Sequence, residues 1–83
     1  MKVYIKSYHP SNRIDDYLKK HFDDWNEDNK QCEFLNQSAF NIMDILERII
    51  LDGYNVKTQW LTSDKFESKE IMIWLDNGNF NQR

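Results

Sequence analysis

The longest mainly apolar block of the chain lies at its centre, between Ser38 and Gly53. Between Ala39 and Asp52 the polar residues recur at intervals of three or four, at Asn41, Asp44, Glu47, Arg48 and Asp52. A helix with this spacing has one narrow polar stripe, so we expect most of its surface to be covered. Ser38 is a favourable N-cap, and Gly53 is a favourable left-handed stop. The pattern therefore predicts a central, largely buried helix.

Two elements are predicted before this helix. Residues Lys2–Tyr8 alternate between apolar and polar positions, which is typical of a half-buried strand. Pro10 disfavours helix at the residue before it, and Ser11 can cap the segment that follows. From Asn12 to about Trp25 one apolar face recurs at helical spacing, through Ile14, Tyr17, Leu18, Phe22 and Trp25.

Three short strands complete the predicted set. Gln31–Leu35 follows the polar loop Asn26–Lys30 and is predicted as a short buried strand. Tyr54–Leu61 is predicted as a strand with Tyr54, Val56, Thr58 and Trp60 on one face. Ile71–Leu75 is a continuous apolar run, which suits a strand covered on both faces. Thr62–Lys69 is predicted as a polar connection.

The resulting order is strand, helix, strand, helix, strand, strand, which predicts a small α/β domain with a mixed four-stranded sheet and two helices. The first three strands alternate with helices, which favours parallel pairing through right-handed crossovers. The last strand follows a connection without a helical pattern, so its orientation stays open, with an antiparallel one allowed. We expect one domain over residues 1–76 and a tail over residues 77–83.

Composition limits the classes of partner. The chain has 83 residues, 40% of them hydrophobic and 30% charged, which is typical of one globular domain. Its net charge of −3 argues against direct binding to nucleic acid or an anionic membrane and permits a basic protein partner. Cys32 is the only cysteine, and no signal peptide or membrane-length apolar run is visible, so we expect a cytoplasmic protein.

No catalytic or metal-binding pattern is visible in the sequence. Cys32, His9 and His21 do not form a recognised ligand spacing, and the two glycines form no phosphate-binding loop. Cys32 lies in a predicted buried strand, where a free cysteine acts as a small apolar residue. We therefore predict a protein that is not an enzyme and that needs no cofactor or metal.

Four carboxylates cluster around the end of the first predicted helix, at Asp23, Asp24, Glu27 and Asp28. One interpretation is an acidic docking surface for a basic partner. The other is a solvated helix end and loop. The first interpretation leads to an alternative function, a small acidic inhibitor or antitoxin-like protein that blocks a basic nucleic-acid-binding partner.

The turn that enters the central helix, Asn36-Gln37-Ser38, is a second candidate site. Helix N–H groups without intrahelical partners point outward there, and no acidic residue precedes Asp44 in the helix. A phosphate on Ser38 would meet these N–H groups and the positive end of the helix dipole. Alternatively, Ser38 is only an N-cap.

The segment Cys32–Trp60 resembles the centre of the SiaC-type biofilm-regulatory proteins, a STAS-like family. The similar positions are Asn36, Ser38, Asp44-Ile45-Leu46, Gly53, Val56 and Trp60. Upstream, Ser7-Tyr8-His9-Pro10 and then Tyr17, Leu18 and Trp25 are similar to the first strand, turn and helix of that family. The resemblance extends over about residues 3–61.

This resemblance implies a STAS-like fold and a non-enzymatic switch that is phosphorylated before the central helix and binds a protein partner when unmodified. The phosphorylated threonine of the family aligns with Gln37, and its second serine aligns with Ala39, so Ser38 is the hydroxyl that remains as acceptor. The contact would involve Asn36, Gln37 and Ser38. A homodimer is also possible, since Trp74 and the Ile71–Leu75 strand belong either to the core or to a sheet edge that pairs with a second copy.

Overall fold

The computed structural model describes residues 1–61 and 69–78 of the chain. Two helices and five strands follow one another in the order β1, α1, β2, β3, α2, β4, β5. Their bounds are Lys2–Ser7 for β1, Asn12–His21 for α1, Trp25–Asn26 for β2, Gln31–Phe34 for β3, Ala39–Leu51 for α2, Asn55–Trp60 for β4 and Glu70–Asp76 for β5. The predicted small α/β domain with two helices is therefore confirmed, with five strands in place of four.

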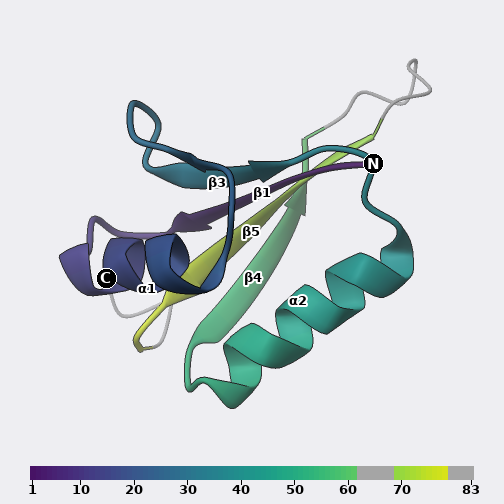
Figure 1. Ribbon diagram of the computed structural model, residues 1–83. Coiled ribbons are helices and arrows are strands. Elements are labelled where there is room, and N and C mark those ends of the chain that lie inside the picture. Colours follow the sequence, from purple (N-terminus) through teal and green to yellow (C-terminus); the bar gives the residue numbers. More distant parts are fainter. Residues whose placement is uncertain (62–68, 79–83) are drawn as a thin grey trace.

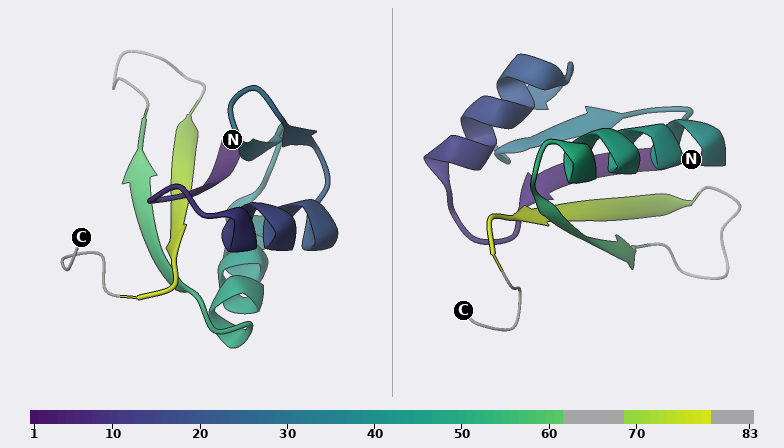
Figure 2. Two further views of the ribbon diagram at one scale, coloured as in Figure 1. Left: turned by 90° about the vertical axis from the view of Figure 1, so that its left-hand side faces the viewer. Right: turned by 90° about the horizontal axis from the view of Figure 1, so that it is seen from below.

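The strands form one mixed sheet in the order β2-β3-β1-β5-β4 (Figure 1). Both helices lie on the same face of this sheet, as the view from below shows (Figure 2). The phenol of Tyr17 in α1 donates a hydrogen bond of 2.5 Å to Asp52, at the end of α2. This contact joins the two helices above the sheet.

The predicted parallel pairing of the first strands is wrong, because β1 and β3 are antiparallel. Helix α1 ends at His21 and not near Trp25; Phe22 is already extended and Asp24 has a φ of 60°. Two aspartates at a helix C-terminus oppose the helix dipole, and Asp tolerates the left-handed conformation, so the chain leaves the helix here. Trp25 then begins β2, a strand that the sequence pattern does not predict.

The hairpin of β2 and β3 explains the reversal. Trp25 pairs with Cys32 and Asn26 with Gln31, so residues 27–30 form a tight connection. The side-chain oxygen of Asn26 accepts hydrogen bonds from the N–H groups of Asp28 and Asn29, which is a common way for asparagine to stabilise a turn. Since the hairpin turns the chain round, β3 enters the sheet beside β1 in the opposite direction.

Strand β5 lies inside the sheet, parallel to β1 and antiparallel to β4. The antiparallel orientation relative to the preceding strand is thus the one that occurs. The alternative in which Ile71–Leu75 forms a sheet edge is wrong, because β1 and β4 flank this strand on its two sides. Its interior place explains the continuous apolar run.

The hydrophobic core lies between the sheet and the helices. From the sheet it receives alternate residues of the central strands, and from the helices it receives Ile14, Leu18, Ile42 and Ile49. The apolar strand residues that are fully buried are Val3, Ile5, Cys32, Ile73 and Leu75. Burial of Cys32 confirms its predicted role as a small core residue, and it raises the pKa of the thiol to about 12.

Two predicted segments fall partly outside the described residues. The polar connection Thr62–Lys69 is described only at Lys69, and the tail over residues 77–83 only at Asn77 and Gly78. Within the described parts of the chain, neither helix has the length and apolar character that a membrane span requires.

Candidate functional site

The Asn36-Gln37-Ser38 turn is fixed by backbone contacts to the first residue of the chain. The N–H of Gln37 donates to the carbonyl of Met1 at 2.8 Å, and the Met1 nitrogen donates to the carbonyl of Gln37 at 3.1 Å. Asn36 has a φ of 57°, a left-handed conformation that asparagine tolerates better than most residues. The turn is therefore held beside Met1, at the start of β1, while its side chains reach the surface.

Ser38 is the N-cap of α2, as predicted. Its hydroxyl accepts a hydrogen bond of 3.2 Å from the N–H of Asn41. The first turn of α2 contains no acidic residue, and Ser38 is exposed. This leaves a positive helix terminus at an accessible hydroxyl.

The prediction that most of α2 is covered is wrong. Phe40 is 79% exposed, Leu51 is 78% exposed and Met43 is 63% exposed. Ile50 is 54% exposed, although Ile49 beside it is fully buried. We call Phe40, Met43, Ile50 and Leu51 the α2 stripe.

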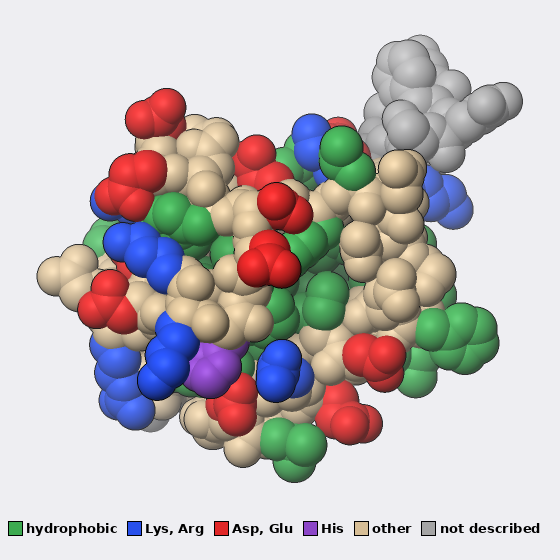
Figure 3. Space-filling view, in the orientation of Figure 1, with side chains coloured by type: hydrophobic (Ala, Val, Ile, Leu, Met, Phe, Trp, Pro, Cys, Tyr) green, Lys and Arg blue, Asp and Glu red, His purple; other side chains and the backbone are tan. Residues whose placement is uncertain are grey.

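The sheet lies against only one side of α2, and this explains why the α2 stripe on the other side is exposed. Ile42 and Ile49 point into the core, with Ile45 and Leu46 partly buried beside them. At 100° per residue, Phe40 and Leu51 lie on the opposite side of the helix, about three turns apart. Figure 3 shows hydrophobic side chains projecting over the region of α2, whereas charged side chains dominate over α1. The apolar residues of α2 extend beyond the core-facing arc, and one sheet face cannot cover them all.

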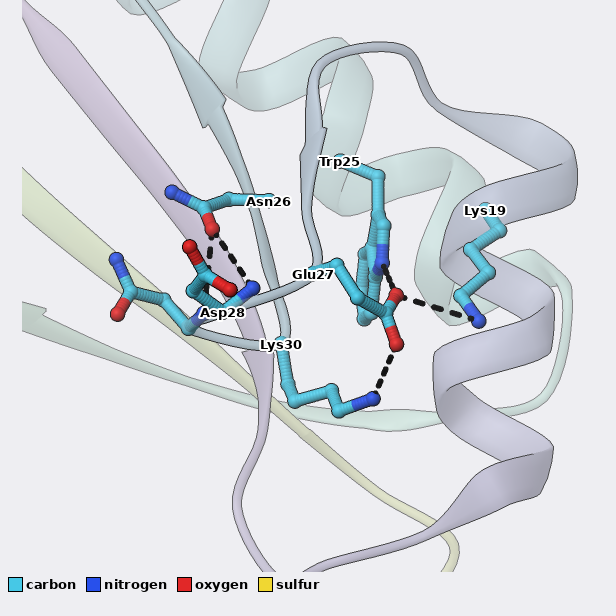
Figure 4. A network of polar contacts seen from close by, with 7 residues as sticks. Lys19, Trp25, Asn26, Glu27, Asp28 and Lys30 are labelled. Atoms are coloured by element: carbon cyan, nitrogen blue, oxygen red, sulfur yellow. Dashed lines mark hydrogen bonds and ion pairs between the residues drawn. The ribbon is translucent and has the colours of Figure 1, made fainter.

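The acidic cluster does not form one uniform surface. The Glu27 carboxylate accepts a hydrogen bond of 2.6 Å from the indole of Trp25 and forms ion pairs with Lys30 and, at 3.7 Å, with Lys19 (Figure 4). The Lys30 ammonium and the indole N–H lower the pKa of the Glu27 carboxyl to about 2. Lys19 also lies over the Trp25 ring, 5.3 Å from its centroid. Glu27 therefore links α1 to the β2–β3 hairpin.

The other three carboxylates, Asp23, Asp24 and Asp28, are exposed. Asp24 and Glu27 line an open depression of about 690 Å³ that also reaches Gln37. The remaining lining residues are Trp25, Asn26, Glu33, Phe34 and Leu35. The structure thus brings one residue of the predicted turn and two of the predicted acidic residues to the same depression.

A second cavity of about 810 Å³ lies against the start of α1, and its lining includes Lys6, Tyr8, Asp15 and Trp74. Burial raises the pKa of the Asp15 carboxyl. Within the described residues no cluster of three or more His, Cys, Asp or Glu side chains has the geometry of a metal site. The charged residues that line the first depression are all acidic, whereas those of the second cavity have both signs.

The three comparisons with known proteins, against family models, curated proteins and solved structures, find no match for this chain.

Proposed function

We propose that this protein is a small non-enzymatic regulatory module of STAS-like type that binds another protein through the α2 stripe and the adjoining Asn36-Gln37-Ser38 turn. The observation that carries the proposal is the exposure of four large apolar side chains on one helix whose core-facing residues are already buried. Exposed apolar patches on small domains commonly mark protein contacts.

The energetics favour a helix-mediated contact. Each large apolar side chain that a partner covers completely contributes roughly 1.5–3 kcal/mol. Phe40 and Leu51 lie near the two ends of α2, so a partner that covers both must extend along the helix. Asp44 and Arg48 are exposed on a neighbouring side of the same helix, where they would lie at the polar rim of the contact.

Ser38 supplies the regulatory part of the proposal. It is exposed and lies two residues before Phe40, at the edge of the stripe. Phosphorylation would add about −1.5 to −2 charges at this point and would bring a strongly hydrated group to an apolar contact. A partner that binds the unmodified stripe would then be released, as the resemblance to the SiaC-type proteins implies. As part of the same proposal, the protein acts in the cytoplasm.

The test compares three purified, tagged chains as baits for proteins of the native host. The wild type is compared with a Phe40→Ser/Leu51→Ser double variant and with an Asp16→Ser/Lys20→Ser control on the exposed side of α1. We expect the double variant alone to lose the partner, with recovery at least about tenfold lower, because a hot-spot contact of 2 kcal/mol or more is removed. Equal recovery by all three chains would refute the proposed contact.

Salt dependence separates this function from the acidic-inhibitor alternative. A contact through the α2 stripe keeps its partner at moderate salt, whereas a contact through Asp23, Asp24 and Asp28 loses it. For the switch, Ser38→Asp should weaken the recovery and Ser38→Ala should preserve it. If both variants recover the partner equally, Ser38 has no regulatory role, and the intact mass of the native protein reports directly whether a phosphate is present.

A further inference from the structure

The sheet edge formed by β4 is a second candidate contact surface. Strand β4 is last in the sheet order and pairs with β5 without interruption from Asn55 to Trp60. It contains no proline and no bulge, which are two common protections of an edge strand. Among the described residues, nothing pairs with its other side.

The hydrogen-bond pattern shows which groups face that side. The N–H of Leu61 donates to the carbonyl of Glu70 at 2.9 Å, and these two residues are opposite each other in the register of β4 and β5. Hydrogen-bonded and non-hydrogen-bonded pairs alternate in an antiparallel ladder, so the backbone groups of Asn55, Lys57 and Gln59 also face β5. Those of Val56, Thr58 and Trp60 therefore face the open edge.

The side chains of these three residues leave the edge uncharged on the helix side of the sheet. Val56, Thr58 and Trp60 lie opposite the core residues Leu75, Ile73 and Ile71 of β5, and so share their face. The C-terminal end of α2 and the start of β4 lie close together at the Gly53 turn, and the two elements diverge from there, as Figures 1 and 2 both show. Trp60, at the diverging end, is 60% exposed.

The charged residue of β4 does not protect the open edge from pairing with another strand. Its single charged residue, Lys57, lies on the other face of the sheet, with its ammonium 5.3 Å from the centre of the Tyr8 ring. A lysine that pointed along the open edge would repel an incoming strand.

From this geometry we infer that β4 pairs with β4 of a second copy of the chain, antiparallel and with the twofold axis at Thr58. This register makes three hydrogen-bonded pairs, Thr58 with Thr58 and Val56 with Trp60 on each side of the axis. Each Trp60 ring then lies opposite Val56 of the partner copy, on the helix side of the sheet. The product is one continuous sheet with four helices on one face.

Charge decides between the available registers. A twofold axis one residue earlier would bring Lys57 opposite Lys57, and like charges directly opposite destabilise a strand pair. An axis at Thr58 brings Lys57 opposite Gln59, so no charged pair of the same sign forms. An axis at Gln59 leaves Val56 without a partner from the other β4 and makes fewer pairs. The edge is thus complementary to itself in one register.

The experiment measures self-association of the full chain by sedimentation equilibrium over a wide range of concentration. We expect a monomer–dimer equilibrium for the wild type. Thr58→Lys and Thr58→Asp each bring like charges together on the twofold axis, and we expect each to weaken the dimer by about tenfold or more. Thr58→Val keeps the strand and the apolar contact and should dimerise at least as well as the wild type.

A mixture of the two charged variants provides the decisive test. Because residue 58 meets itself only in the proposed register, an equimolar mixture of the Thr58→Lys and Thr58→Asp chains should recover the dimer. A wild type that stays monomeric overturns the inference, and so does a mixture that remains as weakly associated as each variant alone. A dimer that survives Thr58→Lys but is lost in Phe40→Ser/Leu51→Ser would place self-association on the α2 stripe and also overturn it. Far-ultraviolet circular dichroism of each variant confirms that the chains compared are folded.

Discussion

The two edges of the sheet are built in opposite ways. At one edge β2 has two residues, and the hairpin that carries it is tied to α1 through Glu27, which contacts Trp25, Lys19 and Lys30. At the other edge β4 has six regularly paired residues, and α2 diverges from it. One edge is thus short and closed by side chains, whereas the other is long and presents backbone groups and an exposed tryptophan.

The difference shows where a small domain can leave surface for binding. The β2 edge pairs the Glu27 carboxylate with two lysines within the chain. On the β4 side, the core-facing residues of α2 are buried, whereas Phe40, Leu51 and Trp60 are exposed to solvent. We therefore locate both proposed contacts, the α2 stripe and the β4 edge, in the half of the molecule that contains α2 and β4.

The largest effect on stability is expected from truncating a buried side chain of α2. Ile49→Ala leaves a cavity below the helix and should lower the free energy of unfolding by about 2–5 kcal/mol. Ile50→Ala is the matched control, because Ile50 differs by one position and is 54% exposed. We expect the control to lose less than about 1 kcal/mol, since much of its surface is in water already. Urea unfolding followed by tryptophan fluorescence measures both, and equal losses would show that α2 is not packed as described.

A smaller effect is expected at the N-cap of the same helix. Ser38→Ala removes the hydrogen bond to the N–H of Asn41 and should cost about 1 kcal/mol. Ser38→Asp retains an acceptor and adds a negative charge at the positive end of the helix, so it should be as stable as the wild type. Thermal unfolding of the three chains tests this order. If Ser38→Asp were as unstable as Ser38→Ala, loss of binding in either variant could reflect damage to the helix.

Much of the fold could be predicted from local sequence patterns. Alternation located β1 and β4, the continuous apolar run located β5, and Ser38 and Gly53 marked the limits of α2 correctly. Gly53 has a φ of 97°, the conformation that its position after the helix requires. Short-range preferences determined these elements, so the sequence alone was sufficient for them.

The sheet order could not be predicted in this way. Strand β2 has two residues, too few for any periodic signal, yet its hairpin reverses the direction of β3. The place of β5 between β1 and β4 depends on pairing between the two ends of the chain, which no local pattern encodes. For the candidate site, the cap at Ser38 was predictable, but the exposed α2 stripe was not. Whether an apolar helix position is buried depends on how far the sheet extends beneath it.

Cys32 tests whether the β2 edge is closed. It pairs with Trp25 across the hairpin and is fully buried, so native protein should react with a thiol reagent only through opening of this edge. The folded thiol has a pKa raised to about 12, above the value of about 9 expected for the unfolded chain. Its stabilising contribution is therefore complete below about pH 9 and is lost as the pH rises towards 12. Cys32→Ala should be less sensitive to alkali than the wild type, and rapid labelling of native Cys32 at neutral pH would contradict a closed edge.

The smallest effect is expected from the ion pairs of the β2 edge. Glu27→Gln keeps a side chain of the same shape but removes the charge that Lys19 and Lys30 contact. The folded pKa of Glu27 is lowered to about 2, so the contribution of its charge is present above the unfolded value near 4.5 and disappears as the pH falls to 2. We expect a slightly lower melting temperature for Glu27→Gln at neutral pH, no difference near pH 2, and a smaller difference in high salt because the pairs are exposed. Melting curves of both proteins against pH and salt measure this. A difference that persists at pH 2 would mean that the glutamine disturbs the turn itself, and the closing of this edge would then depend on backbone geometry rather than on charge.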